Sequence, residues 1–239
     1  MRILVLFGSK SDESVYSPLI SKLKQEHEVE FQVLSAHRNP DRLDVVIKTT
    51  TADIIVAGAG LAAHLPGVIA SKTKLPVFGI PVDSVMGGLD ALLSIQQMPF
   101  GIPVLCTSPD KMSINEFIGK WEKGDSDKEV NIIINENGRD LPHVKKELDR
   151  TMEYAEKNNL KVSISNKKSD KLFNINMVQE KNEILQGMFG IHVPLLSDTK
   201  KKSPTTALEL LEWTNSGGLW VGVNNTRNAL IFHQKMLSN

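Results

Sequence analysis

RILVLFGSKSD, residues 2–12, joins a short apolar run to a polar turn. After Arg2 the run has no polar residue, which is typical of a strand buried on both faces of a sheet. The turn supplies Gly8 for a tight bend and hydroxyl groups that suit the start of a helix. A strand that passes directly into a helix predicts a βαβ unit and a parallel sheet.

Further apolar runs alternate with helical patterns through the first half of the chain. We expect helices in residues 13–27, 41–51 and 88–98, and strands in residues 29–34, 53–60, 75–82 and 101–107. Right-handed crossovers then give an α/β fold, a three-layer αβα, flavodoxin-like parallel sheet. In such sheets ligands bind beyond the carboxyl ends of the strands.

The pattern begins again after the polar stretch KWEKGDSDKE (120–129), which we interpret as a linker. Residues 130–172 align with residues 2–43, so that Asp140 falls under Asp12, and residues 207–225 align with 91–108. We interpret this as an internal duplication, although any two strand–helix–strand units share some likeness. The prediction is a first repeat in residues 1–124 and a degenerate second repeat in 125–239.

The two repeats differ in their chemistry. Asn166 and Lys167 fall under His37 and Arg38, and the second repeat has no counterpart of AGAGLAAHLPG (57–67). Because asparagine does not exchange a proton near neutral pH, we expect chemistry in the first repeat only.

The composition of the chain bears on whether it binds nucleic acid or a membrane. The 28 basic residues balance 28 acidic ones, so no net field attracts nucleic acid or an anionic membrane. No stretch approaches the ~20 apolar residues of a membrane span, and no signal peptide is visible. The single cysteine, Cys106, lies in an apolar run and is expected to be a buried, inert thiol. These features indicate a soluble cytoplasmic protein.

Two polar turns fall at carboxyl ends of predicted strands. In GSKSD (8–12), Ser9, Ser11 and Asp12 could bind a phosphate or a sugar hydroxyl, or could simply cap the helix. In SAHRNP (35–40), His37 is a base that titrates near neutral pH, and Arg38 is a permanent cation suited to phosphate. An adjacent base and cation at a strand end, opposite a serine-rich turn, favours a functional site.

The third candidate, AGAGLAAHLPG (57–67), combines small residues with a histidine. Small side chains leave backbone amides able to approach a ligand closely, such as a carboxylate or carbon dioxide. His64 either closes this loop or packs as an ordinary histidine; the residues alone leave both open. The GxGxxG spacing of a dinucleotide site is not met, so we expect no dinucleotide cofactor.

These motifs, together with GLDALLSIQQMPFGIPV (88–104), resemble the class I N5-carboxyaminoimidazole ribonucleotide mutases of purine biosynthesis, the PurE family. The likeness covers residues 2 to about 107, and the segment VGVNNTRNALIFHQKML (221–237) resembles the family's C-terminal segment. The resemblance implies an isomerase that binds a small nucleotide, with no metal and no organic cofactor. It also implies octamers, so for this duplicated chain we expect a homo-oligomer, a tetramer that mimics an octamer.

The resemblance also implies roles for individual residues. His37 matches the family's general acid and base. The substrate-binding positions match Ser9, Ser11, Asp12, Ser35, Arg38, Gly58, Ala59, Gly60, His64 and Leu65.

Three features bear on the choice of reaction. SAHR, rather than the SAHK of related enzymes that use carbon dioxide directly, favours the mutase. Leu61 stands where a glycine is usual, and Asp83 where a glutamine is usual; a carboxylate facing a carboxylated substrate would repel it. The alternatives are a direct carboxylase of aminoimidazole ribonucleotide and a non-catalytic sensor of nucleotide phosphate.

Overall fold

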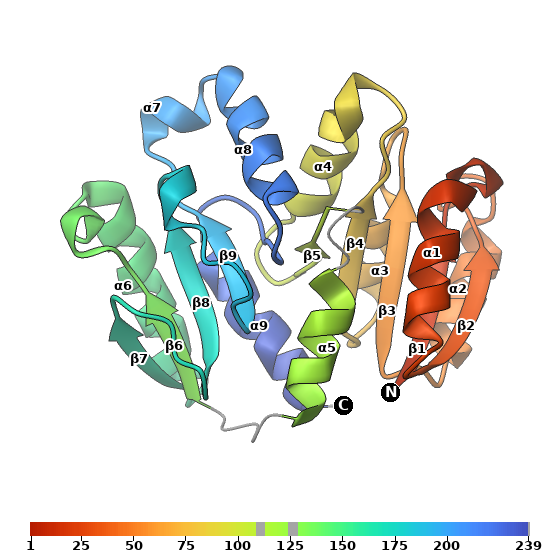
Figure 1. The fold of residues 1–239 in the computed structure, drawn as a ribbon, viewed down its shortest axis with the longest axis horizontal. Coiled ribbons are helices and arrows are strands. Elements are labelled where there is room, and N and C mark those ends of the chain that lie inside the picture. The colour runs from red at the N-terminus through yellow and green to blue at the C-terminus, as the bar shows by residue number, and fades with distance from the viewer. Residues whose placement is uncertain (109–112, 124–128, 239) are drawn as a thin grey trace.

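The computed structural model of the protein describes residues 1–108, 113–123 and 129–238, which form two parallel sheets (Figure 1). The first has the strand order β2-β1-β3-β4-β5 and the second the order β7-β6-β8-β9. The first order is that of flavodoxin-like folds, and the second repeats its first four places. The predicted α/β, flavodoxin-like architecture is confirmed.

The first sheet is built mainly from apolar, buried strands, and its edge strand β2 alternates polar and apolar residues. Its strands are β1 (Arg2–Phe7), β2 (Glu28–Val33), β3 (Ile54–Ala59), β4 (Val77–Pro81) and β5 (Leu105–Cys106). The helices of this half are α1 (Glu13–Leu23), α2 (Pro40–Thr49), α3 (Leu65–Lys72), α4 (Leu89–Gln96) and α5 (Ser113–Lys123). Proline stands at the start of α2 and α3, where its missing N–H costs nothing.

The second half repeats the order of the strands but has no helix where the first half has α2 and α3. Its strands are β6 (Glu129–Ile133), β7 (Lys161–Ser165), β8 (Phe173–Val178) and β9 (Gly190–Pro194). Its helices are α6 (Pro142–Lys157), α7 (Asp198–Lys201), α8 (Thr205–Asn215) and α9 (Thr226–Leu237). Between β8 and β9 lies only a 3-10 turn, η5 (Lys181–Glu183), where the first half has α3.

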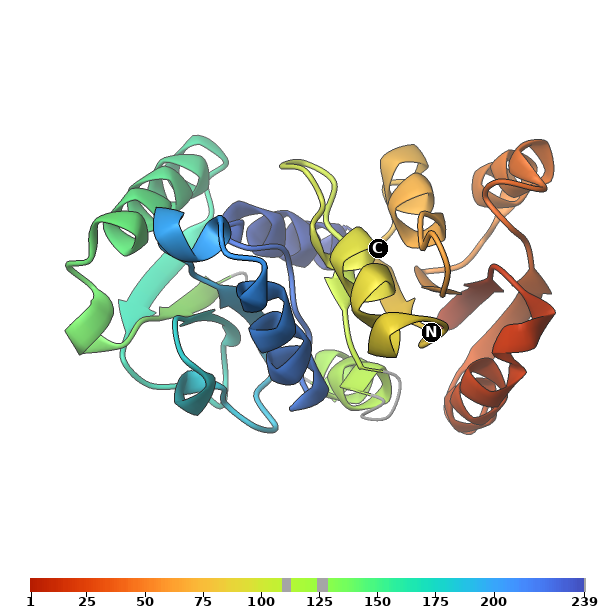
Figure 2. The ribbon, with the colours of Figure 1, turned by 90° about the horizontal axis from the view of Figure 1, so that it is seen from above.

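Helices cover both faces of the first sheet. Seen from above, α1 and α5 lie on one side of the first sheet, and α2 and α3 lie on the other (Figure 2). The strands of both sheets point toward the same end of the molecule, the top of Figure 1. The carboxyl ends of both sheets, where ligands bind in such folds, therefore share that end.

The two sheets meet at an antiparallel bridge between Cys106 of β5 and Trp220. The backbone N–H of each residue donates to the carbonyl of the other at 2.8 Å. Trp220 also bridges to His192 of β9 in the parallel sense, so it occupies the fifth place beside the second sheet. The chain thus joins its two halves edge to edge.

An aromatic cluster fills the space below this junction. The ring of Phe117 on α5 lies 5.7 Å from that of Phe78 in β4 and 6.1 Å from that of Phe173 in β8. Phe232 of α9 lies 5.2 Å from Phe78. Because these rings come from both halves, the halves share one hydrophobic core.

Several boundaries differ from the predicted ones. Residues 120–123 belong to helix α5, and Glu129 begins β6, so the linker prediction was wrong at both ends. Its middle, residues 124–128, and with it the repeat boundary at 124/125, lies outside the described residues. Of the strand expected in 101–107, only Leu105 and Cys106 form β5.

The place of Asp12 in the second half is not taken by Asp140. Asp12 ends the 3-10 turn that Ser9 caps, and the matching turn, Glu136–Gly138, is capped by Asn135 and ends at Gly138. Asp140 lies two residues further on and is exposed, whereas Asp12 is buried. The apparent match of the two aspartates came from sequence spacing alone.

Helix α9 is capped by a side chain from another helix. Glu147 of α6 is buried, pairs with Arg150, and accepts the backbone N–H of Thr226 through Oε1 at 2.7 Å. Asn225, at the N-cap itself, makes no side-chain capping bond. Glu147 therefore links α6 to the first turn of α9.

Glu147→Ala is expected to lower the free energy of unfolding by about 1–3 kcal/mol, because the Thr226 N–H is left without an acceptor. Burial raises the pKa of Glu147, so its stabilising contribution is largest below the ordinary glutamate pKa and falls as pH rises through the folded value. Glu147→Gln keeps a side-chain oxygen that can accept the Thr226 N–H. As pH rises and wild-type Glu147 ionises in its buried place, the free energy of unfolding of this variant should increase relative to that of the wild type. Urea unfolding at several pH values tests both; an unchanged alanine variant would contradict the capping role.

The thiol of Cys106 is buried at the junction of the two sheets, and burial raises its pKa well above the ordinary value. We expect native protein to react with a thiol reagent only at the rate of unfolding, because the thiolate is the reactive form. Reaction of Cys106 in denaturant is the control. Rapid labelling of native protein would show that the junction opens locally.

No helix in the described ranges is long and apolar enough to cross a membrane.

Candidate active site

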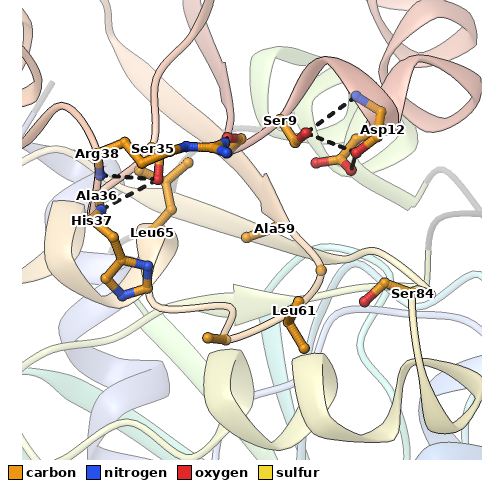
Figure 3. A pocket seen from close by; sticks show the side chains of 14 residues that line it. Ser9, Asp12, Ser35, Ala36, His37, Arg38, Ala59, Leu61, Leu65 and Ser84 are labelled. Carbon is orange, nitrogen blue, oxygen red and sulfur yellow. Dashed lines mark hydrogen bonds between the residues drawn. The ribbon is translucent and has the colours of Figure 1, made fainter.

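A cavity of about 360 Å³ lies at the carboxyl ends of β1, β2 and β3 (Figure 3). Its walls come from the turns after these three strands and from the loop after β4. The lining residues are Gly8, Ser9, Ser11, Asp12, Ser35, Ala36, His37, Arg38, Ala59, Gly60, Leu61, Ala62, Leu65 and Ser84. The convergence predicted from the strand ends is therefore present.

The turn after β1 is held by its own hydroxyl groups. Ser9 Oγ accepts the backbone N–H of Ser11 at 3.2 Å and the Ser11 hydroxyl at 2.7 Å. Ser11 Oγ also lies 3.1 Å from Asp12 Oδ1. Burial raises the pKa of Asp12, while the bonds from Ser11 and Ser9 and the charge of Arg38 act in the opposite direction. The turn presents two hydroxyls and one carboxyl group to the cavity.

The turn after β2 carries the base and the cation. Ser35 Oγ accepts the backbone N–H groups of His37 and Arg38, each at 3.3 Å. These two bonds hold the backbone from which both side chains project. The Arg38 side chain reaches across toward the first turn, and its Nη2 donates to the carbonyl of Gly8 at 2.8 Å (Figure 3). A guanidinium has five N–H donors, so most of them stay available for an anion.

The imidazoles of His37 and His64 are joined by a hydrogen bond. His37 Nε2 lies 2.9 Å from His64 Nδ1, and the two rings meet edge to face at 81°. One of these nitrogens donates and the other accepts, so the bond holds a single proton between them. The protonation of either ring is thereby linked to the tautomer of the other.

The loop after β3 forms the third wall. A Cβ atom at Gly60 would lie 3.0 Å from Ser84 Oγ, so a larger residue there would require the loop after β4 to shift. Ala62 has a φ of 50°, a left-handed conformation that costs a non-glycine residue free energy and marks a constrained loop. Leu61 is 74% exposed at the cavity edge.

Most of the residues predicted from the sequence line this cavity; Gly58 and His64 do not. Gly58 lies within β3, and a Cβ there would fall 2.2 Å from the Phe7 ring, so its small size serves packing. His64 contacts His37 instead. Gly8 and Ser84 were missing from the predicted site, although both lie in turns whose position after a strand could have indicated them.

Asp83 does not line the cavity. Asp83 is exposed to solvent, and it is the next residue, Ser84, that lines the cavity. The expected repulsion of a carboxylated substrate therefore does not arise from Asp83 within this chain. In the described part of the chain, no group of three or more His, Cys, Asp and Glu side chains is placed to hold a metal ion.

The fold and the cavity define an α/β enzyme with a nucleotide-sized site at the carboxyl edge of its first sheet. Residues 2–115 match the family model described as AIR carboxylase. The N5-carboxyaminoimidazole ribonucleotide mutase of Methanocaldococcus jannaschii is 49% identical over 111 residues, which cover 46% of this chain and 70% of the relative. The chain belongs to this family of purine-biosynthetic mutases, as the motifs of its first half predicted.

The mutase of Pseudomonas aeruginosa is 50% identical over 107 residues, covering 42% of this chain and 64% of that protein. The crystal structure of Treponema denticola PurE aligns with a TM-score of 0.46 and 19% identity, covering 65% of this chain and 97% of that one.

Proposed function

We propose that this chain converts N5-carboxyaminoimidazole ribonucleotide to 4-carboxy-5-aminoimidazole ribonucleotide. One observation carries the proposal most directly: an imidazole, a guanidinium and a hydroxyl-rich turn line a single cavity in a chain of this family. A cation and a base within one small site suit a reaction that moves a carboxyl group on a phosphorylated substrate.

The substrate's phosphate binds Arg38 and the Ser9–Ser11 turn. The guanidinium already points toward that turn, and its unused N–H groups suit bidentate contact with phosphate oxygens. Asp12 accepts a ribose hydroxyl, and Ser35 holds the backbone from which His37 and Arg38 project. These contacts place the imidazole ring of the substrate beside His37.

His37 acts first as an acid and then as a base. Protonated His37 gives its proton to the carbamate nitrogen, and the N–C bond breaks to release carbon dioxide. The ring carbon of the substrate then attacks carbon dioxide, and neutral His37 takes the proton from that carbon. One proton is given and one is recovered, so the residue ends as it began.

Carbon dioxide has to stay in the site between these two steps. The loop of Ala59, Gly60 and Leu65 encloses it and excludes water, which prevents a wasteful decarboxylation. His64 positions the His37 ring through the hydrogen bond between His37 Nε2 and His64 Nδ1. The proton in this bond can move toward His64 or back toward His37 as His37 gives a proton to the substrate and later takes one from it. Neither step requires a metal or an organic cofactor.

The test compares turnover of two substrates by the wild-type chain. One reaction starts from N5-carboxyaminoimidazole ribonucleotide and the other from aminoimidazole ribonucleotide with excess bicarbonate. Faster use of the first supports the mutase. Faster use of the second would indicate a direct carboxylase, and no turnover of either with nucleotide still bound would indicate a sensor.

We further propose that the chain forms a tetramer whose eight repeats take the place of an octamer. Exposed apolar side chains near the cavity support this, because Leu61 is 74% and Met86 77% exposed. Such residues in neighbouring loops suit contact with another chain. Light scattering should give four times the chain mass of 26.5 kDa. An active species with the mass of a single chain would rule the tetramer out.

A further inference from the structure

A second cavity, of about 400 Å³, lies at the carboxyl ends of the second sheet. It occupies the place in the second half that the active-site cavity occupies in the first. The residues that line it are Ile133, Asn135, Glu136, Asn137, Asn166, Asn176, Met177, Asn182, Glu183 and Leu185. It is as large as the first cavity and falls within the range of small-molecule sites.

The turns around this cavity copy those of the first. Asn135 Oδ1 accepts the backbone N–H two residues ahead, at Asn137, as Ser9 Oγ accepts that of Ser11. Ser165 Oγ accepts the backbone N–H of Lys167, two residues ahead, as Ser35 Oγ does with His37. Each turn thus shares one hydrogen bond with its counterpart, although Ser165 ends β7 whereas Ser35 lies two residues beyond β2.

The cation of the corresponding turn in the second half, Lys167, lies outside this cavity. Lys167 is exposed and does not line the cavity, whereas Asn166 does. The cation that the alignment put in place of Arg38 therefore does not reach the site.

The lining of the second cavity is acidic, whereas a phosphate site needs positively charged groups. No Lys, Arg or His is among its lining residues, and two of them, Glu136 and Glu183, are carboxylates. The nearest buried imidazole, His192, contacts Asn176, and burial lowers its pKa to about 4, which keeps it uncharged at neutral pH. An anion would meet negative charge here without a compensating cation.

The remaining polar groups are carboxamides held in fixed positions. Asn176 is buried, and its Nδ2 donates to the carbonyl of Glu183 at 2.8 Å. Asn135 Nδ2 donates to Glu183 Oε1 at 2.8 Å, and Asn166 Nδ2 donates to Glu136 Oε1. A carboxamide both donates and accepts, and a carboxylate accepts, so this lining complements hydroxyl and ring N–H groups.

We propose that the second cavity binds an uncharged, hydroxyl-rich ligand of nucleoside size, a ribonucleoside without its phosphate. The cavity lies at the corresponding strand ends and has a volume similar to that of the first, and the absence of a cation from its described lining selects against phosphate. The Glu136 carboxylate accepts sugar hydroxyls, and the asparagines contact the base edge, while Glu183 holds the wall in place because its carboxylate accepts Asn135 Nδ2 and the backbone N–H of Gln179. This inference is independent of the proposed reaction, which uses the first cavity only.

The test is a ligand-observed NMR titration of the full chain with adenosine, inosine, cytidine and uridine, and with the 5′-monophosphate of each. Asn166→Trp fills the second cavity, and Lys167→Trp, on the exposed neighbour, is the matched control. We expect at least one nucleoside to bind with a Kd of about 1 mM or tighter. Asn166→Trp should weaken that binding about tenfold or more, Lys167→Trp should not, and turnover at the first cavity should stay within about twofold in both.

A comparison of nucleoside and monophosphate affinities tests whether the second cavity selects against phosphate. At the site that Asn166→Trp blocks, the Kd of the nucleoside should be about tenfold or more below that of its 5′-monophosphate. Glu136→Gln should reduce the ratio of these two Kd values, because it removes one negative charge from the lining. The inference is overturned if no nucleoside binding is sensitive to Asn166→Trp, or if the monophosphate is preferred there. Thermal unfolding of each variant confirms that it is folded.

Discussion

His37→Asn is expected to lower kcat by about 10²–10⁴-fold while the affinity for the nucleotide stays near that of the wild type. Asparagine can form hydrogen bonds from the same place, but it neither gives nor takes a proton near neutral pH. Both proposed proton transfers are therefore lost together. Binding is kept because phosphate and ribose contacts come from Arg38 and the turn after β1.

Steady-state kinetics and direct binding of the nucleotide distinguish these effects. His143→Asn in the second half, which lies outside both cavities, is the matched control and should leave kcat unchanged. His64→Asn should have a smaller effect than His37→Asn, because His64 acts only through its bond to His37. Wild-type turnover by His37→Asn would remove His37 from the mechanism.

Arg38→Leu is expected to weaken nucleotide binding by about 10- to 100-fold, since a hydrogen bond to a charged group contributes about 1.5–3 kcal/mol. The effect should appear mainly in KM, because the phosphate is held alike in the substrate and in the transition state. Arg38→Lys should be intermediate, since lysine keeps the charge but loses the bidentate geometry.

Two controls separate loss of phosphate contact from damage to the site. Arg42→Leu removes an exposed arginine of α2 outside the cavity and should leave KM unchanged. The riboside form of the substrate, which lacks the phosphate, should bind Arg38→Leu and wild type equally well. An equal loss for the riboside would mean that Arg38 shapes the site through its bond to Gly8 rather than binding phosphate.

The sequence predicted the first sheet well because β1, β3 and β4 are mostly apolar runs, β2 alternates polar and apolar residues, and the turns carry glycine and serine. It did not predict α3, whose LPGVIASK begins with proline and glycine, or α5, whose charged end resembled a linker. Strand β8 was also missed, because FNINMV places asparagines inside a buried strand. Those asparagines are satisfied by contacts that only the fold provides; Asn174 Nδ2, for instance, donates to backbone carbonyls.

The site was predictable where it depends on position along the strands. Ser9, Asp12 and Arg38 follow strand ends, and parallel strands bring such residues together. The bond between His37 and His64 was not predictable, because it depends on the path of a loop that passes through the left-handed Ala62. The Cys106–Trp220 bridge joins residues that are far apart in sequence, and no local pattern indicates it.

That bridge also decides what happens to an exposed sheet edge. A first half on its own would end at β5 with unpaired N–H and C=O groups, which readily recruit strands from other molecules. In this chain the Cys106 groups bond to Trp220, and the aromatic rings of α5 and α9 cover the space below. The second half therefore keeps this edge of the first sheet from pairing with strands of other molecules.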